Sequence, residues 1–132
     1  GCTGTLVARR PLAEEVVITA GQTALHDPRF APVAYLELPG LHVEISVLTP
    51  PQPLAFDGPD DLLSKLRPNV DGVTLHLDGR RATFLPQVWE SAPEPDLFLA
   101  LLSQKMGYAP EAWRSPDLQV ETYQAVVIEE PA

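Results

Sequence analysis

The chain has 132 residues, with 18 acidic against 9 basic side chains and a formal net charge of −9, which argues against nucleic-acid binding because that function needs a basic face. Apolar residues make up 45% of the chain, enough for one core, and no apolar run approaches the roughly 20 residues that cross a bilayer. The lone Cys2 cannot form an internal disulfide and no secretory signal opens the chain, so we expect a soluble cytoplasmic protein that binds no membrane.

The first third of the chain predicts a strand, a helix and a second strand. Residues 2–7 resemble a short strand that bends at Gly4. Pro11 suits the first position of a helix, and apolar residues then repeat at helical spacing to about Leu25. After a loop rich in proline, residues 41–48 alternate between apolar and polar side chains, which predicts a half-buried antiparallel strand.

The strongest local signal is the Asp78-Gly79 pair, which lies between two runs rich in apolar residues. Both residues tolerate the positive φ of a two-residue turn, so residues 73–85 are predicted to form a β-hairpin. Pro86 has no N–H for a ladder and ends the second strand, so residues 87–89 leave the sheet together.

Two more helices and a last extended segment complete the pattern. A short helix is predicted over residues 57–66, after a stiff spacer at residues 50–53. A longer helix is predicted from Pro93 to Met106, with Gly107 as its cap and a buried stripe of Leu97, Phe98, Leu101 and Leu102. Residues 118–128 are predicted to be extended. The fold class is therefore α+β, an antiparallel sheet with flanking helices.

With these landmarks placed, the chain resembles the AMMECR-type domain family, also called AmmeMemoRadiSam system protein A. The resemblance covers the whole chain and rests on several motifs in order, with Thr3 where the family usually has isoleucine. These motifs are Gly1-Cys2-Thr3-Gly4-Thr5-Leu6, Asp27-Pro28-Arg29-Phe30, Glu44-Ile45-Ser46-Val47-Leu48, Asp71-Gly72-Val73 and Arg81-Ala82-Thr83-Phe84-Leu85-Pro86-Gln87-Val88-Trp89.

The resemblance carries further expectations. It implies a single domain over residues 1–132 with a small subdomain beside the sheet, and a further helix and strand before residue 1 that would pair with residues 2–7. The family name records a genomic association with a Memo-type protein and a radical-SAM enzyme, which are therefore the expected partners. We expect no cofactor. The family's own activity is unsettled, so the resemblance names no reaction.

Cys2 is the candidate catalytic residue. A thiol acts as a nucleophile or redox group only as thiolate, which requires a nearby cation, base or helix N-terminus. The alternative is a small buried sulfur that packs against its neighbours.

A ligand site is predicted from residues whose polar or aromatic side chains could bind a ligand, and from glycines that would let a ligand approach the backbone closely. A guanidinium binds carboxylate or phosphate, so the expected ligand is a small anion or a peptide. The alternatives are that Arg29 pairs with Asp27 and that Trp89 fills the core with one satisfied N–H. The candidates are Gly1, Gly4, Arg29, Thr83, Gln87 and Trp89.

Three residues form a weaker candidate metal site. His42 and Glu44 share one face of a predicted strand, and His76 lies in the hairpin. No closely spaced pair of histidines or cysteines supports the site, and a polar strand face needs no metal, so no metal is expected. Three function classes stay open: a ligand-binding or accessory module, which we favour, a cysteine-dependent enzyme, and a protein-interaction scaffold.

Overall fold

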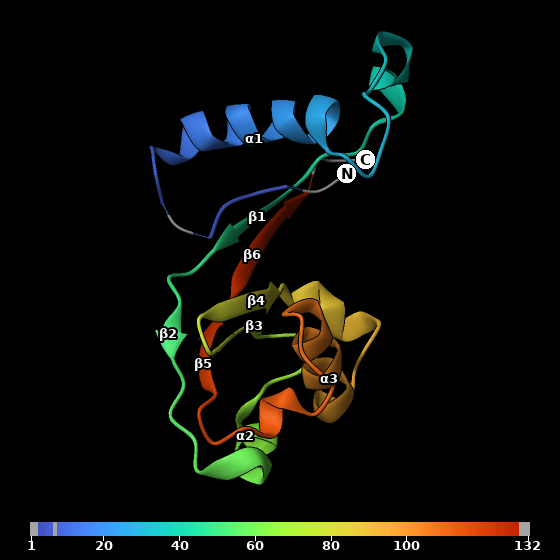
Figure 1. The fold of residues 1–132 in the computed structure, drawn as a ribbon. Helices are drawn as coiled ribbons and strands as arrows, with labels where there is room; N and C mark the ends of the chain where they lie inside the picture. Colours follow the sequence, from blue (N-terminus) through green and yellow to red (C-terminus); the bar gives the residue numbers. More distant parts are fainter. Residues whose placement is uncertain (1–2, 7, 130–132) are drawn as a thin grey trace. The chain divides into compact units, whose positions relative to one another are not determined.

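A computed structural model describes residues 3–6 and 8–129 and divides the chain into two compact units (Figure 1). The first unit comprises residues 1–47 and 127–132, and the second comprises residues 48–126. Within the described residues, no helix has the length and apolar character required to cross a membrane.

The first unit contains one long helix and little regular structure besides. Helix α1 (Leu12–His26) confirms the predicted helix, and a 3₁₀ helix η1 (Tyr35–Gly40) follows it. Strand β1 (Glu44–Leu48) pairs with β6 (Ala125–Glu129) and starts three residues later than predicted. Residues 3–6 form no strand, since no described strand pairs with them; Cys2 and Val7 lie outside the described residues.

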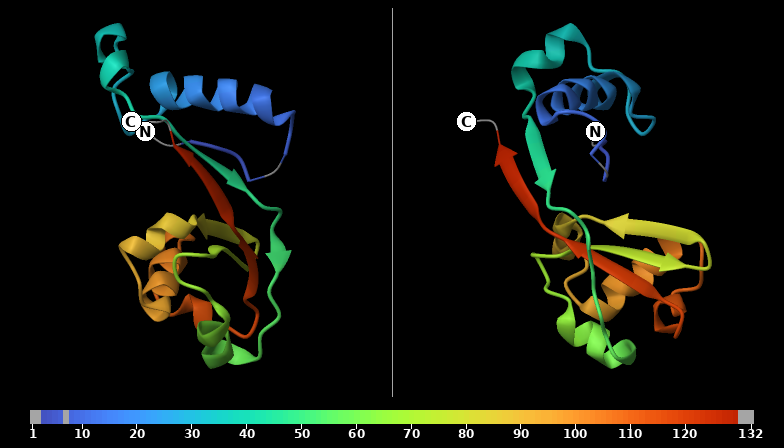
Figure 2. Two further views of the ribbon diagram at one scale, coloured as in Figure 1. Left: turned by 180° about the vertical axis from the view of Figure 1, so that it is seen from behind. Right: turned by 90° about the vertical axis from the view of Figure 1, so that its left-hand side faces the viewer.

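The second unit is built on a four-stranded sheet in the order β2-β5-β3-β4, and every neighbouring pair is antiparallel. The strands are β2 (Gln52–Pro53), β3 (Gly72–Leu77), β4 (Arg80–Phe84) and β5 (Gln119–Tyr123). Both views in Figure 2 show β3, β4 and β5 side by side. The fold class is therefore α+β, as predicted.

The central hairpin confirms the Asp78-Gly79 signal. Asp78 has a φ of 50° and Gly79 a φ of 80°, so both turn residues have the positive values that a tight two-residue turn requires. The turn fixes the register, which places Leu77 opposite Arg80 and His76 opposite Arg81. β4 ends before Pro86, and a 3₁₀ helix η2 (Pro86–Glu90) leads the chain away from the sheet, as predicted.

In the second unit, helix α2 spans Gly58–Lys65, α3 spans Pro95–Lys105, and a 3₁₀ helix η3 spans Ala112–Arg114. Helices α2 and α3 each carry a proline in the first turn and end one residue before the predicted ends, and α3 starts two residues later than predicted. Gly107 has a φ of 98°, and its N–H donates to the carbonyl of Gln104, which closes the end of α3.

The predicted buried stripe of α3 is wrong in half of its members. Leu97 and Leu101 are 46% and 39% exposed, whereas Leu99 and Ser103 are buried beside Phe98 and Leu102. Apolar residues occupy most of the circumference of this helix, so its periodicity does not show which side turns inward. Packing against the sheet and η2 decides that orientation.

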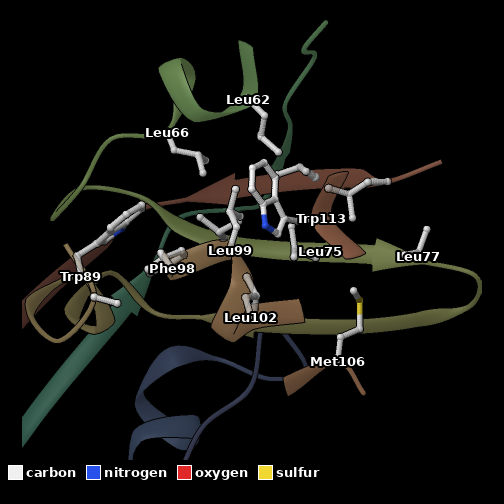
Figure 3. Packing of buried hydrophobic residues seen from close by; sticks show 14 residues of the cluster. Leu62, Leu66, Leu75, Leu77, Trp89, Phe98, Leu99, Leu102, Met106 and Trp113 are labelled. Atoms are coloured by element: carbon white, nitrogen blue, oxygen red, sulfur yellow. The ribbon is translucent and has the colours of Figure 1, made fainter. Parts of the chain in front are cut away.

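A cluster of 14 buried residues fills the space between one face of the sheet and the helices (Figure 3). Val73, Leu75 and Val120 supply the sheet side of this cluster. Trp89 lies flat against Phe98, with ring centroids 3.7 Å apart and planes inclined by 9°. Its indole N–H donates to the carbonyl of Asp71 at 2.7 Å, so Trp89 is a fully buried residue with a satisfied polar group.

The predicted extended segment at residues 118–128 is two strands. β5 belongs to the four-stranded sheet and β6 to the two-stranded one, and Gln124 lies between them. The backbone N–H of Gln124 donates to Thr49 Oγ1 at 2.8 Å, and its side-chain Nε2 donates to Asp71 Oδ1 at 3.0 Å. These bonds hold the chain where it leaves the larger sheet.

Candidate functional site

The face of the sheet opposite the core is polar. Because side chains alternate along a strand, β3, β4 and β5 point their remaining residues to this outer face. The register sets them in two rows, Thr83–Thr74–Glu121 and Arg81–His76–Gln119, with Tyr123 opposite Gly72 at one end. Side chains directly opposite each other on an antiparallel pair are about 5 Å apart at Cβ, so each row is a chain of neighbours.

One end of the outer face is a hydroxyl network. Thr83 Oγ1 lies 3.0 Å from Thr74 Oγ1, 3.0 Å from the carbonyl of Val73 and 2.8 Å from the Tyr123 hydroxyl. Burial raises the pKa of Tyr123, and the hydrogen bond with Thr83 opposes this shift. The Tyr123 ring needs the space above Gly72, where a side chain would collide with it. This end is therefore closed by its own packing.

An imidazole and a carboxylate pair in the middle of the outer face. His76 Nε2 lies 2.6 Å from Glu121 Oε1, and each side chain is about one third exposed. Glu121 thereby fixes the orientation of the imidazole ring. Within the described part of the chain, the other ring nitrogen of His76 has no hydrogen-bond partner.

The other end of the outer face opens into a shallow hollow of about 360 Å³ at the hairpin tip. His76, Arg81 and Gln119 form one side of the hollow and the turn forms another. The lining comprises His76, Leu77, Asp78, Gly79, Arg80, Arg81, Asp117 and Gln119. Its volume falls within the range of small-ligand sites, although its lining is far more polar than usual.

The two arginines that line the hollow differ in whether their guanidinium groups already have partners. Arg80 Nη1 donates to the carbonyl of Gly107 at 3.4 Å, and the guanidinium lies 5.1 Å from the centre of the Tyr108 ring. Arg81 is exposed and forms no ion pair with any described carboxylate. Arg81 is therefore the cation that the hollow offers to a ligand.

The structure gives the three predicted ligand residues of this unit different surroundings. Thr83 uses its hydroxyl in the network beside Tyr123. Trp89 fills the core and has a satisfied N–H, which is the alternative to a ligand-binding role. Gln87 is exposed on η2. None of the three lines the hollow.

The predicted site residues of the first unit are described separately. Arg29 holds Asp27 through Nε at 3.0 Å and Nη2 at 2.8 Å, which is the ion pair considered as its alternative, and its guanidinium lies 5.8 Å from the centre of the Phe30 ring. Gly4 lies in irregular backbone. Gly1 and Cys2 lie outside the described residues, so the thiol prediction stays a prediction.

The candidate metal residues divide between the units. His42 and Glu44 belong to the first unit and His76 to the second. His42 precedes β1, so it is not on the strand that was predicted to carry it. Among residues 3–6 and 8–129, no group of three or more histidine, cysteine or acidic side chains has the spacing to hold a metal.

Sequence reasoning missed most of the hollow. The sequence predicts no place in a ligand site for His76, Asp78 or Arg81: His76 is a weak metal candidate, Asp78 a turn residue and Arg81 part of a motif. The hairpin alone would have placed His76 opposite Arg81, because a two-residue turn fixes the register. No local signal places Asp117 and Gln119 there, since that requires the pairing of β3 with β5.

The motif residues in the second unit have structural roles. Asp71 accepts hydrogen bonds from Arg67 Nη2 at 2.8 Å and Gln124 Nε2 at 3.0 Å on its carboxylate, while its carbonyl accepts the Trp89 indole. The bond to Asp71 raises the pKa of Arg67. Asp71 and Trp89 thus tie the sheet to η2, while Gly72 and Thr83 make their contacts with Tyr123 inside the sheet.

Comparison with known proteins agrees with this architecture. The AMMECR1 family model matches residues 1–128. A protein of Methanothermobacter thermautotrophicus is 37% identical over 131 residues, which are 98% of this chain and 68% of that protein. A protein of Thermofilum pendens is 35% identical over 131 residues, which are 98% of this chain and 62% of its own length.

A solved structure has the same fold. The crystal structure of the uncharacterised protein PH0010 from Pyrococcus horikoshii superposes with a TM-score of 0.85 at 32% sequence identity, over 95% of this chain and 62% of that one. The chain thus spans about two thirds of the length of these relatives. The family match, the two relatives and the shared fold together show that this chain belongs to the AMMECR1 family.

Proposed function

We propose that this chain is a ligand-binding or accessory component that holds a small ligand with an anionic group in the hollow at the hairpin tip. The observation that carries the proposal is Arg81, an exposed guanidinium that borders the hollow and forms no ion pair with a described carboxylate. A guanidinium fork binds carboxylate or phosphate with two parallel hydrogen bonds.

The neighbours of Arg81 support an anion-binding role. His76 lies directly opposite Arg81 on β3 and offers a second ring nitrogen, while Gln119 adds an amide from β5. All three residues belong to strands of a sheet that packs on a closed core, Arg81 on the edge strand β4, so their backbone positions are fixed before a ligand arrives.

The test is a titration of the ¹⁵N-labelled chain with pentanoate and, separately, with inorganic phosphate at low ionic strength. We expect amide chemical shifts to move at residues 76–81 and 117–119, with dissociation constants in the millimolar range or tighter. The variant Arg81→Gln should lose these shifts. The control Arg9→Gln removes the same charge from the first unit and should retain them.

Shifts that survive Arg81→Gln, or that lie elsewhere on the second unit, would contradict the proposal. The ligand could also be a peptide, and a C-terminal carboxylate would use the same guanidinium. A short peptide amide is the matched probe for that case, since it lacks the carboxylate and should leave the hollow unchanged.

An accessory role also accommodates the partners that the family resemblance implies. A component that holds a small ligand would serve a Memo-type protein or a radical-SAM enzyme by presenting that ligand, and co-purification with either would support this part of the proposal. The alternative, a cysteine-dependent enzyme, predicts that Cys2 alkylates quickly near neutral pH.

A further inference from the structure

The charges that line the hollow show which kind of anionic ligand suits it. Besides Arg80 and Arg81, the residues that line the hollow include two acidic ones, Asp78 and Asp117. Neither carboxylate has an ion-pair or hydrogen-bond partner for its side chain among the residues that the structure describes. The hollow therefore presents two uncommitted negative charges and one uncommitted positive charge.

The remaining charged groups near the hollow already have partners. Glu121 pairs with His76 at 2.6 Å. Arg80 donates to the Gly107 carbonyl and lies against the Tyr108 ring. A ligand with a carboxylate alone would bind Arg81 but would face the negative field of Asp78 and Asp117, which opposes its entry.

From this charge arrangement we infer that the ligand is zwitterionic, with a carboxylate for Arg81 and an ammonium group for Asp78 and Asp117. The inference rests on the proposed function, since it names the chemical class of the ligand held in the same hollow. A free amino acid or a related amino carboxylate has these two groups on a body small enough for about 360 Å³.

The backbone supports the role of Asp78. The hairpin turn holds this residue at a φ of 50°, a conformation that asparagine and aspartate adopt more readily than other residues with a side chain. Turn geometry explains why either residue stands at this position, but it does not select the charged one. Asp78→Asn therefore removes the charge and keeps the turn.

The experiment compares matched pairs of probes at equal ionic strength. Alanine is compared with 2-methylpropanoate, and 4-aminobutanoate with pentanoate; within each pair a methyl group replaces the ammonium group. Binding is followed by the amide shifts of residues 76–81 and 117–119. We expect at least one zwitterion to bind about tenfold more tightly than its matched anion, because charge-assisted hydrogen bonds are the strong ones.

Variants assign the effect to its residues. Asp78→Asn and Asp117→Asn should each reduce the advantage of the zwitterion and leave the matched anion bound as tightly or more tightly. The control Asp60→Asn removes a carboxylate from the first turn of α2, outside the hollow. It should leave both dissociation constants unchanged.

The outcomes separate this inference from the proposed function. If the anions bind in an Arg81-dependent way and neither zwitterion binds more tightly than its matched anion, the zwitterion inference is overturned and the ligand-binding proposal stands. If an advantage of the zwitterion survives both aspartate variants, the inference is also overturned. If neither these four probes nor inorganic phosphate shift the amides of the hollow in an Arg81-dependent way, both are overturned.

Discussion

The two units of this chain differ in where their apolar side chains go. The second unit buries a cluster of 14 residues between its sheet and its helices. In the described part of the first unit no apolar side chain is buried, and the apolar residues of α1 include Val17 at 72% exposure and Leu12 at 58%. Stability follows buried apolar area, so we expect the second unit to carry the cooperative unfolding of the chain.

The difference also explains why the candidate site lies where it does. A ligand site needs a backbone that keeps its position when the ligand is absent, and elements anchored on a core provide it. His76, Arg81 and Gln119 stand on strands whose other faces contribute Leu75, Leu77 and Val120 to that core. The first unit offers no comparable anchor within its described residues.

The largest effect is expected from Trp89→Ala. The change removes a fully buried ring that stacks on Phe98 and leaves a cavity, which should lower the free energy of unfolding by about 3–5 kcal/mol. The matched change in the first unit is Val17→Ala at an exposed helix position. It should alter the free energy of unfolding by less than about 0.5 kcal/mol. Urea denaturation followed by circular dichroism measures both, and equal losses would show that the units share one core.

Alanine substitutions at two glycines, one in each unit, are expected to change stability in opposite directions. A β-carbon on Gly72 would overlap the Tyr123 ring, so Gly72→Ala should destabilise the second unit by roughly 1–3 kcal/mol. Gly21 lies within α1 with no atom near the position of an added β-carbon, so Gly21→Ala should stabilise that helix by roughly 0.5–1 kcal/mol. Thermal unfolding and the helical signal in circular dichroism measure both variants. If Gly72→Ala leaves the stability unchanged, the close contact between Gly72 and the Tyr123 ring is contradicted.

The parts of the second unit that local chemistry decides were predictable from sequence. The Asp78-Gly79 pair specifies its turn by backbone conformation alone, and Pro86 ends β4 because it has no N–H. Gly107 closes α3 because it can adopt a φ of 98°. Each of these features depends on one or two residues and their own allowed conformations.

The features that sequence reasoning missed depend on distant partners. α3 has apolar residues on most sides, so only tertiary packing could show that Leu99 faces inward and Leu97 does not. The hollow needs β5 beside β3, a pairing between Gln119 and His76 that no local pattern encodes. Thr83 and Trp89 are predicted as ligand residues from their side-chain chemistry alone. In the structure, Thr83 belongs to a hydroxyl network and Trp89 to the packed core.

A pH-dependent prediction concerns Tyr123. Burial raises its pKa above the ordinary value of about 10, so the folded state holds the phenolic proton more tightly than the unfolded state. This contribution to stability is complete below about pH 10 and is lost as the pH rises through the raised pKa. Tyr123→Phe should cost about 1 kcal/mol at neutral pH through the lost hydroxyl bonds.

The difference between wild type and Tyr123→Phe should therefore shrink as the pH is raised above 10. Urea unfolding at a series of alkaline pH values measures it. The control Tyr35→Phe changes an exposed ring in the first unit and should leave the free energy of unfolding unaltered at neutral pH. A constant difference between wild type and Tyr123→Phe across the alkaline range would contradict the role of burial.

The smallest effect is expected where the two units look most alike. Each contains an exposed arginine that holds a buried aspartate: Arg67 Nη2 lies 2.8 Å from Asp71 Oδ1, and Arg29 Nη2 lies 2.8 Å from Asp27 Oδ2. Water screens both guanidinium groups, which limits what either ion pair contributes. Asp71 is also bound to Gln124 and Trp89, so loss of Arg67 disturbs residues that join the sheet to the core.

Arg67→Ala should therefore lower the thermal midpoint of the second unit modestly, while Arg29→Ala should leave that midpoint unchanged. The effect of Arg29→Ala should appear only in amide hydrogen exchange, as faster exchange at Phe30 and Val33, whose N–H groups bond to Asp27 and Ala24. If Arg29→Ala lowers the midpoint of the second unit as much as Arg67→Ala does, the two units unfold together. The exposed apolar residues of α1 would then contribute to the same cooperative structure as Trp89, despite their different burial.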